Sequence, residues 1–258
     1  MIKISVITCT YNGSPTITST VTSVLSQKYE AVEHIIVDGA STDGTLDIVG
    51  RYKDYSDFQD NGHKVIILSE PDDGLYYAMN KAIGLATGDY MVFLNSGDYF
   101  PDEYTLYNIS SCVKNENQLP GVIYGDTDLV DSEGNMLRRR RLSPPEKLTW
   151  RSFSNGMLVC HQAFYALTSI AKVTPYNTKY RYSADVDWCI RIMKAAKKEN
   201  RELRNAHQVL VNYLSEGMTT QNHKASLRER FDIMKNHYGI VITLWKHLWF
   251  SFRIIVKQ

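Results

Sequence analysis

Short apolar runs alternate with amphipathic stretches in the N-terminal part of the chain. Four such runs predict buried strands, at residues 4–10, 34–37, 64–68 and 91–94, and the first of them is rich in β-branched residues. Three stretches between them place apolar residues at helical spacing, at residues 16–27, from Thr45 onward and at residues 75–86. This alternation predicts parallel strands joined by right-handed crossovers, the arrangement of a nucleotide-binding half-domain.

The pattern is less regular after Asp98. We expect a helix at 103–114, a strand at 121–126, a strand-like segment at 155–165, a helix that opens at Ser183 and a late strand at 209–213. Further helical segments complete the chain. The order of elements therefore indicates an α/β protein throughout.

Composition limits the possible classes of function more than it limits the fold. A chain of 258 residues fits one large domain, or one domain with a small appendage. The net charge of +1 gives no overall field that attracts nucleic acid, so we expect no nucleic-acid partner; the local exception is the arginine run 138–141. The four cysteines are far apart and form no C-x-x-C pair, which argues against a zinc site or a disulfide framework and fits a reducing compartment.

Polar residues follow the apolar run at 91–94 directly. In open α/β sheets ligands bind outside the carboxyl ends of strands, so Asn95, Ser96 and Asp98 lie where chemistry is expected. A carboxylate placed to meet a phosphate needs a divalent cation between them, and Mg2+ and Mn2+ prefer oxygen ligands. From the residues alone, the alternative is that Asp98 only caps the next segment.

Four segments resemble one known family in the same order. They read S-V-I-T-C-T-Y-N, V-D-G-A-S-T-D-G-T, E-P-D-D-G-L-Y-Y-A-M-N-K-A-I-G-L-A-T-G-D-Y and F-L-N-S-G-D-Y-F. Together they resemble glycosyltransferase family 2, the inverting sugar transferases of the GT-A fold, from about Ile4 to Thr220. The resemblance implies a Rossmann-like half with a mixed, mainly parallel central sheet flanked by helices, plus C-terminal helices. It divides the chain into a GT-A domain at 1–235, with a nucleotide-sugar half at 1–100 and an acceptor half at 101–235, and a C-terminal amphipathic helix at 236–258.

The resemblance also implies a pocket for a nucleotide-sugar donor, with UDP as the expected nucleotide. Nucleotide contacts are implied for Thr10, Asn12, Asp38, Asp73, Asn95 and Ser96. Asp98 is the implied ligand of Mn2+ or Mg2+. The family commonly has D-x-D at this strand end, whereas this chain has Asn95-Ser96-Gly97-Asp98 and keeps one carboxylate, which predicts weaker metal affinity. His223 is one candidate for a second ligand, and an ordinary surface histidine is the alternative.

The segment S-A-D-V-D-W-C-I-R resembles the family's acidic acceptor-side motif. Asp185 matches the general base, which removes the acceptor's hydroxyl proton as the oxygen attacks the anomeric carbon. Ala184 replaces the usual glutamate, and Asp187 is the reserve base. His161 and Gln162 are expected to touch the donor diphosphate or the acceptor sugar; a histidine satisfied within the core is the alternative.

The last twenty residues, 239–258, are very apolar and contain Trp245, Trp249, Phe250 and Phe252 with interspersed basic residues. This run is too interrupted to span a bilayer and suits an interfacial helix, while packing on the domain or on a dimer partner is the alternative.

The resemblance implies a hexosyl transfer from a UDP-sugar to a saccharide acceptor. The acceptor is expected to be lipid-linked, in bacterial O-antigen, capsule or exopolysaccharide synthesis. The enzyme is expected in the cytoplasm, peripheral on the inner face of the plasma membrane. An inactive GT-A scaffold and a nucleotidyltransferase are the alternatives, and the oligomeric state is open.

Overall fold

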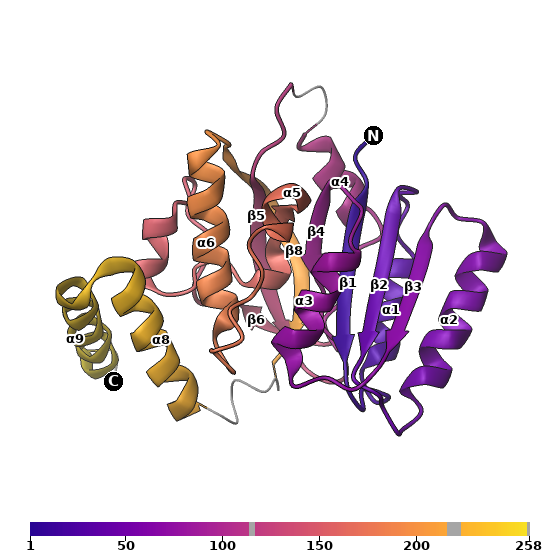
Figure 1. The fold of residues 1–258 in the computed structure, drawn as a ribbon, viewed down its shortest axis with the longest axis horizontal. Coiled ribbons are helices and arrows are strands. Elements are labelled where there is room, and N and C mark those ends of the chain that lie inside the picture. The colour runs from indigo at the N-terminus through magenta and orange to yellow at the C-terminus, as the bar shows by residue number, and fades with distance from the viewer. Residues whose placement is uncertain (114–116, 216–222, 257–258) are drawn as a thin grey trace.

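The computed structural model of the protein describes residues 1–113, 117–215 and 223–256, and for residues 223 and 250–256 it describes the backbone only (Figure 1). Within these residues, eight strands form one mixed sheet in the order β3-β2-β1-β4-β7-β5-β6, with β8 paired to β5. The strands are β1 (Ile4–Thr10), β2 (Val32–Asp38), β3 (Lys64–Ser69), β4 (Tyr90–Phe93), β5 (Val122–Val130), β6 (Met136–Arg139), β7 (Phe164–Leu167) and β8 (Leu203–Leu214). The predicted α/β class with a mixed sheet is confirmed.

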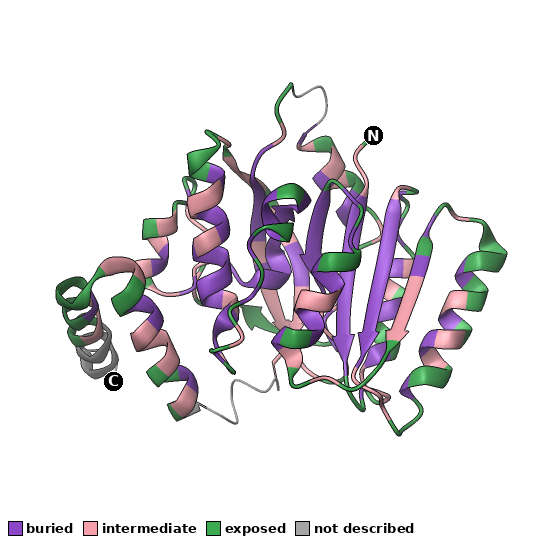
Figure 2. Ribbon diagram, viewed as in Figure 1, coloured by how far each residue is buried: buried purple, intermediate pink, exposed green. Residues whose placement is uncertain are grey.

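The N-terminal half of the sheet is parallel. β1 pairs with β2 and β4, and β2 pairs with β3, all in the same direction. β1, β2 and β4 are buried along their whole length, as their apolar sequences require, because helices cover both faces (Figure 2). These strands end along one edge of the sheet, at the bottom of Figure 1, and the predicted nucleotide residues follow that edge.

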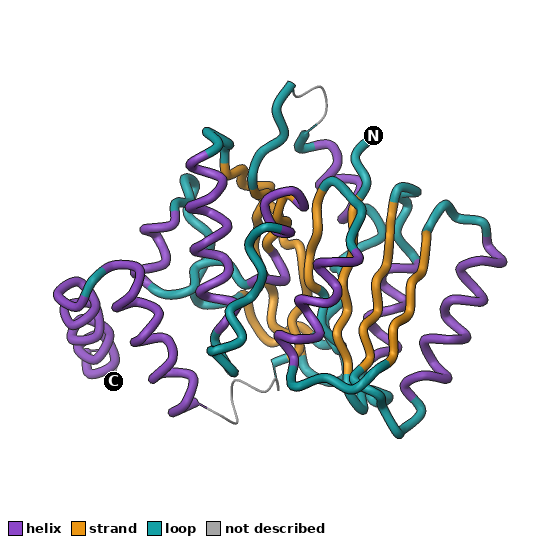
Figure 3. Tube along the Cα trace, viewed as in Figure 1, coloured by secondary structure: helices purple, strands orange, loops and turns teal. Residues whose placement is uncertain are grey.

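Helices cover both faces of this sheet (Figure 3). They are α1 (Ile17–Leu25), α2 (Thr45–Gln59), α3 (Leu75–Leu85), α4 (Thr105–Ser111), α5 (Thr168–Lys172), α6 (Ala184–Lys198), α8 (His223–Tyr238) and α9 (Ile240–Val256). α1 and α2 enclose a small core with β2 and β3, while the main core extends over the rest of the sheet and includes α3 and α6. The alternation of strand and helix predicted for the N-terminal half is confirmed.

The second half of the sheet departs from the predicted pattern. β7 runs antiparallel to both β4 and β5, and β8 runs parallel to β5. The strand-like segment expected over 155–165 is wrong: residues 156–160 form a loop between two short 3-10 helices, Trp150–Asn155 and His161–Ala163, and only the end of the segment enters β7. Val159 is 1% exposed although it pairs with no strand. Burial alone therefore explains the apolar run, and periodicity does not separate a buried loop from a short strand.

The C-terminal region consists of two helices. α8 and α9 are separated by Gly239, which adopts φ +85°, a conformation that favours glycine. Residue 236, the predicted start of the C-terminal amphipathic helix, lies inside α8, and α9 begins at Ile240. Among the described residues no helix is both long and apolar enough to cross a membrane. The two helices lie beyond α6, at the end of the molecule opposite α2 (Figure 1).

Candidate active site

The carboxyl ends of β1, β2 and β3 form the first part of the site. Thr10 and Asp38 are partners in the parallel register. The Asp38 side chain is fully buried and accepts hydrogen bonds from the Ser41 backbone N–H (2.9 Å), the Ser69 hydroxyl (2.7 Å) and the Ser41 hydroxyl. These bonds hold the loop after β2 against the sheet edge. A contact of Asp38 with the base or ribose would be additional to this internal role and stays a prediction.

A buried hydroxyl, that of Thr10, lies at the end of β1. Thr10 Oγ1 makes no hydrogen bond within the described residues. Gly13 lies against it, and a Cβ on Gly13 would be 2.2 Å from this oxygen, so a larger residue does not fit. Leaving a buried polar group unsatisfied costs about 1–3 kcal/mol. Thr10 is therefore placed to bind a ligand, while Asn12, at φ 49°, accepts from the Thr42 N–H (2.9 Å) and joins the two loops.

The turn after β4 is attached to α1. The Ser96 and Thr16 hydroxyls are 2.9 Å apart. Thr20 Oγ1 accepts from the Gly97 N–H (2.9 Å) and donates to the Asp98 carbonyl (2.8 Å). The turn is thus held rigidly beside the loop after β1.

Asp98 points inward from this turn. Its side chain is 4% exposed, and its two oxygens accept from Gln162 Nε2 and from the Leu214 N–H, each at 3.0 Å. Burial raises the pKa of Asp98 to about 7, although the hydrogen bonds from Leu214, Gln162 and Asn95 act in the opposite direction. Asp98 therefore joins three distant segments: the turn after β4, the His161–Ala163 helix and the end of β8.

The described residues at this turn do not fit a resident divalent cation. Both oxygens of Asp98 are engaged by protein donors, and Asn95 brings no charge. No group of three or more His, Cys, Asp or Glu side chains suited to a metal occurs within the described residues. The side chain of His223, the other candidate ligand, lies outside the described part of the structure.

His161 connects the turn after β4 to Tyr176. Its Nε2 is 3.3 Å from Asn95 Nδ2, and its Nδ1 is 3.3 Å from the Tyr176 hydroxyl. Burial lowers the pKa of His161, against the opposing effect of Asp185, so the ring is neutral and accepts from the Asn95 amide. Asn95 Oδ1 is then left buried without a partner among the described residues, which suits a group that meets a ligand.

Asp185 lies in the first turn of α6 and is half-buried. The Tyr76 hydroxyl donates to its Oδ1 at 3.3 Å. Tyr76 in turn stacks on Tyr176, whose hydroxyl lies 3.3 Å from His161 Nδ1. The residue after His161, Gln162, donates to Asp98. Asp98 and Asp185, 87 positions apart, are therefore brought to the same region of the molecule.

Buried aromatic rings hold this region in place. Tyr76 stacks on Tyr176 with ring centroids 5.3 Å apart, and Tyr176 stacks on Trp188 at 4.8 Å. Trp188 Nε1 donates to the Thr174 carbonyl (2.9 Å). Tyr76 and Tyr176, which sequence reasoning missed, are recognisable only when the fold brings α3 and α6 together.

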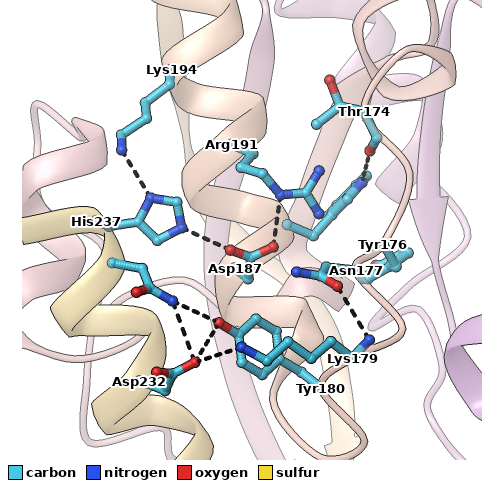
Figure 4. A network of polar contacts seen from close by, with 12 residues as sticks. Thr174, Tyr176, Asn177, Lys179, Tyr180, Asp187, Arg191, Lys194, Asp232 and His237 are labelled. Carbon is cyan, nitrogen blue, oxygen red and sulfur yellow. Dashed lines mark hydrogen bonds and ion pairs between the residues drawn. The ribbon is translucent and has the colours of Figure 1, made fainter.

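Asp187 faces away from the site. It is 5% exposed, and it accepts from Arg191 Nε and from His237 Nε2, each at 2.7 Å (Figure 4). Burial acts to raise the pKa of Asp187, but the hydrogen bonds and charges of His237 and Arg191 lower it overall. Asp187 therefore connects α6 to α8, which leaves Asp185 as the better candidate for the base.

The loop after β3 contains two adjacent carboxylates, and the inward one is not the residue expected. Asp73 is exposed, whereas the Asp72 side chain is only 7% exposed and is 2.5 Å from Lys81 Nζ. Burial and the charge of Asp72 raise the pKa of Cys9 on β1. The spacing of E-P-D-D-G does not show which carboxylate turns inward.

Comparison with known proteins identifies the family. Residues 5–170 match the model of "Glycosyl transferase family 2". The chain belongs to this family. A relative from Mycobacterium bovis (strain BCG / Pasteur 1173P2), "PGL/p-HBAD biosynthesis glycosyltransferase", is 30% identical over 188 residues, which are 72% of this chain and 68% of the relative. Hyaluronan synthase of Pasteurella multocida is 24% identical over 237 residues, 90% of this chain but 22% of that protein.

Solved structures confirm the GT-A fold of this family 2 glycosyltransferase. S. aureus TarS 1–349 in complex with UDP-GlcNAc has a TM-score of 0.69 and 20% identity, covering 91% of this chain and 65% of that one. The mannosyltransferase PcManGT from Pyrobaculum calidifontis, in complex with GDP-Man and Mn2+, has a TM-score of 0.61 and 18% identity, covering 96% and 70%. The predicted class of enzyme, a glycosyltransferase, is confirmed.

Proposed function

We propose that this family 2 glycosyltransferase moves a hexosyl group from a UDP-sugar to a hydroxyl of a saccharide acceptor, with inversion and with Asp185 as general base. The observation that carries the proposal is the convergence of Asp185, Tyr76, His161 and Asn95 at the edge where β1, β2 and β4 end. The family shows the class of enzyme; the base and the sugars are what the proposal adds. TarS, which binds UDP-GlcNAc and UDP, supports the choice of a uridine nucleotide.

The donor would lie along this edge. Thr10 and Asn95 supply buried polar atoms that have no hydrogen-bond partner among the described residues, and Ser96 lies beside them. Asp38 and Asn12 hold the loops that would surround the base and ribose, and the exposed Asp73 would contact the base. His161 and Gln162 hold the turn from the acceptor side, Gln162 through its bond to Asp98.

The transfer is a single displacement. The acceptor oxygen forms a bond to the anomeric carbon as the bond from that carbon to the diphosphate breaks, and the electron pair leaves with UDP. Asp185 takes the acceptor's hydroxyl proton, which requires its carboxylate to lie within about 3 Å of that hydroxyl. Tyr76 orients the carboxylate through its second oxygen. Dependence on Mn2+ or Mg2+ is a separate proposal, supported by the Mn2+ in PcManGT and not by the described side chains.

The acceptor is proposed to be lipid-linked and destined for a bacterial surface polysaccharide, with the enzyme at the inner face of the plasma membrane. The relative named for the biosynthesis of PGL and p-HBAD supports an acceptor of this general kind. An inactive scaffold is disfavoured because the acidic residue of the α6 motif is retained as Asp185, while Ala184 beside it is fully buried. Membership of family 2 also argues against the nucleotidyltransferase alternative.

Hydrolysis of a panel of UDP- and GDP-sugars, with and without Mn2+, tests the proposal. We expect release of UDP from one UDP-sugar, and a fall of roughly 10²–10⁴-fold in Asp185→Asn, since the base is lost. Asp47→Asn is the matched control, because Asp47 also lies in the first turn of a helix but is exposed on α2. Full activity in Asp185→Asn, or no turnover of any nucleotide sugar, would reject it.

A further inference from the structure

α9 is packed with its polar side toward the protein. Thr243 is fully buried and Lys246 Nζ donates to Asn155 Oδ1 at 2.6 Å, so this side of the helix faces the rest of the chain. Val241 and Leu248 are 76% and 73% exposed. An amphipathic helix on a water-soluble surface has the opposite orientation.

The exposed side chains form a continuous apolar face. At 100° per residue, the exposed positions of the described part of α9 fall within one arc of about 200° around the helix axis, and all of them are apolar: Ile240, Val241, Ile242, Leu244, Trp245, Leu248 and Trp249. We call this the α9 face. Contiguous apolar surface of this kind marks an interaction site, and scattered single residues do not.

A basic groove lies on the neighbouring surface of α6 and the Trp150–Asn155 helix. Trp150, Lys194, Lys197 and Lys198 line it. Lys194 Nζ lies 4.5 Å from the centre of the Trp150 ring, and Arg151 stacks on the same ring at 5.1 Å. The Trp150 carbonyl also accepts from the Tyr238 hydroxyl, where α8 leads into α9, so the groove is linked to the helix pair.

We infer that the α9 face and this lysine groove together form a docking surface for an anionic lipid bilayer. Apolar side chains would enter the boundary between headgroups and acyl chains, with Trp245 at headgroup depth. Lys197 and Lys198 are exposed and would meet lipid phosphates. Residues 239–258 contain no Asp or Glu, so no carboxylate in this stretch opposes that contact.

A second copy of the chain fits this surface less well. A two-fold interface brings the same patch from both subunits together. The basic groove would then face its own copy, and like charges would oppose the apolar contact. A bilayer that carries negative charge is complementary to both parts of the surface.

Co-sedimentation of the full-length protein with vesicles tests the inference. We expect binding to an equal mixture of phosphatidylcholine and phosphatidylglycerol, and little binding to phosphatidylcholine alone. Lys197→Glu/Lys198→Glu should weaken binding by at least about tenfold, since each basic residue near an anionic surface contributes about a factor of five. Val241→Asp/Leu248→Asp should abolish it.

The control variant combines both kinds of substitution, basic to Glu and apolar to Asp, at the far end of the molecule. Arg51→Glu/Phe58→Asp replaces one exposed basic and one exposed apolar residue on α2 and should bind as the wild type does. Equal binding by all variants, or no binding to either vesicle, would overturn the inference. So would a wild-type dimer in light scattering that Val241→Asp/Leu248→Asp dissociates, because a second copy would then cover the α9 face.

The docking surface and the proposed reaction are tested independently. Vesicle binding needs no donor sugar, and release of UDP in solution needs no vesicle. We expect Val241→Asp/Leu248→Asp to keep the wild-type melting temperature and the wild-type rate of donor hydrolysis. Absent hydrolysis with intact vesicle binding would reject only the proposed function.

Discussion

A buried histidine connects three elements just behind the site. His34 on β2 is fully buried, with Nδ1 2.8 Å from the Tyr52 hydroxyl and Nε2 2.9 Å from the Thr8 hydroxyl. Thr8 Oγ1 donates to the Leu94 carbonyl (2.8 Å), so it accepts from His34, and Tyr52 donates to Nδ1. Both nitrogens of the neutral ring are therefore hydrogen-bonded. The hydrogen-bond chain runs from Tyr52 through His34 and Thr8 to Leu94, the residue before Asn95.

Protonation of His34 at acidic pH should disrupt these hydrogen bonds. Burial, with a further contribution from His63, lowers the pKa of His34 from 6.5 to about 3. Between these two pKa values the folded state therefore binds fewer protons than the unfolded state. The stability that His34 contributes is fully present above pH 6.5 and is lost as the pH falls from 6.5 toward 3. We expect the free energy of unfolding of the wild type to fall by about 1.4 kcal/mol per pH unit relative to His34→Gln.

Urea unfolding of the wild type and of His34→Gln, at several pH values below 6.5, measures how the difference in their free energies of unfolding changes with pH. His207→Gln is the matched control, since the His207 side chain is 62% exposed. A difference between wild type and His34→Gln that does not change with pH would contradict the assignment of a neutral, buried His34.

Asp98 allows a test between a structural and a metal-binding role. Asp98→Ala leaves Gln162 Nε2 and the Leu214 N–H without their acceptor, so the free energy of unfolding without added metal should fall by about 2 kcal/mol or more. Asp73→Ala, on an exposed side chain of the neighbouring loop, should change it by less than about 0.5 kcal/mol. Unchanged stability of Asp98→Ala, together with loss of a Mn2+-dependent thermal shift, would instead support Asp98 as the metal ligand expected from the sequence.

At the scale of elements, a polar network joins the middle of α6 to α8. His237 Nε2 donates to Asp187, and Lys194 Nζ donates to His237 Nδ1 at 2.8 Å, so the imidazole is bound at both nitrogens (Figure 4). Asp232 on α8 accepts from Lys179 and from the Tyr180 hydroxyl beside it. The helices that present the α9 face are thereby fixed to the helix that presents Asp185.

Removing either partner of the Asp187–His237 pair should destabilise the fold strongly. Because Asp187 is buried, Asp187→Ala is expected to cost about 3–5 kcal/mol, and a double-mutant cycle with His237→Ala should give a coupling of about 1–3 kcal/mol. The exposed pair Lys53–Asp57 on α2 serves as control, with a coupling of about 0.3–0.5 kcal/mol. If Asp187→Asn stayed as stable as the wild type but lost donor hydrolysis, Asp187 would be the base.

Sequence reasoning placed best what depends on strand ends. Thr10, Asp38 and Asn95 follow buried apolar runs, and parallel strands bring such positions to one edge whatever the loops do. It failed where orientation depends on contacts made far along the chain. Nothing near Asp187 indicates that His237, fifty positions later, turns it away from Asp185. The prediction for the 155–165 segment failed for a similar reason, because a segment can be buried by other elements without pairing with a strand.

At the scale of the whole molecule, three helices connect the proposed catalytic edge to the α9 face. Asp185 opens α6, the lysines of the groove end the same helix, and α8 joins α6 to α9 (Figure 1). A bilayer bound to the α9 face would therefore hold the site at a fixed distance from lipid headgroups. An acceptor in that bilayer meets the site at a raised effective concentration, and a soluble acceptor gains nothing.

The two acceptors should therefore respond differently to the same substitutions. With an acceptor carried in phosphatidylglycerol-containing vesicles, Val241→Asp/Leu248→Asp should lower the initial rate of transfer by about 10²-fold, because the encounter is no longer confined to the surface. With a water-soluble analogue of the same acceptor, the rates of variant and wild type should agree, since the catalytic edge is unchanged. The ratio of the two rates, measured side by side with Arg51→Glu/Phe58→Asp, isolates the effect of docking from any loss of folded enzyme. An equal loss with both acceptors would mean that α9 supports the fold of the site and not its delivery to the membrane.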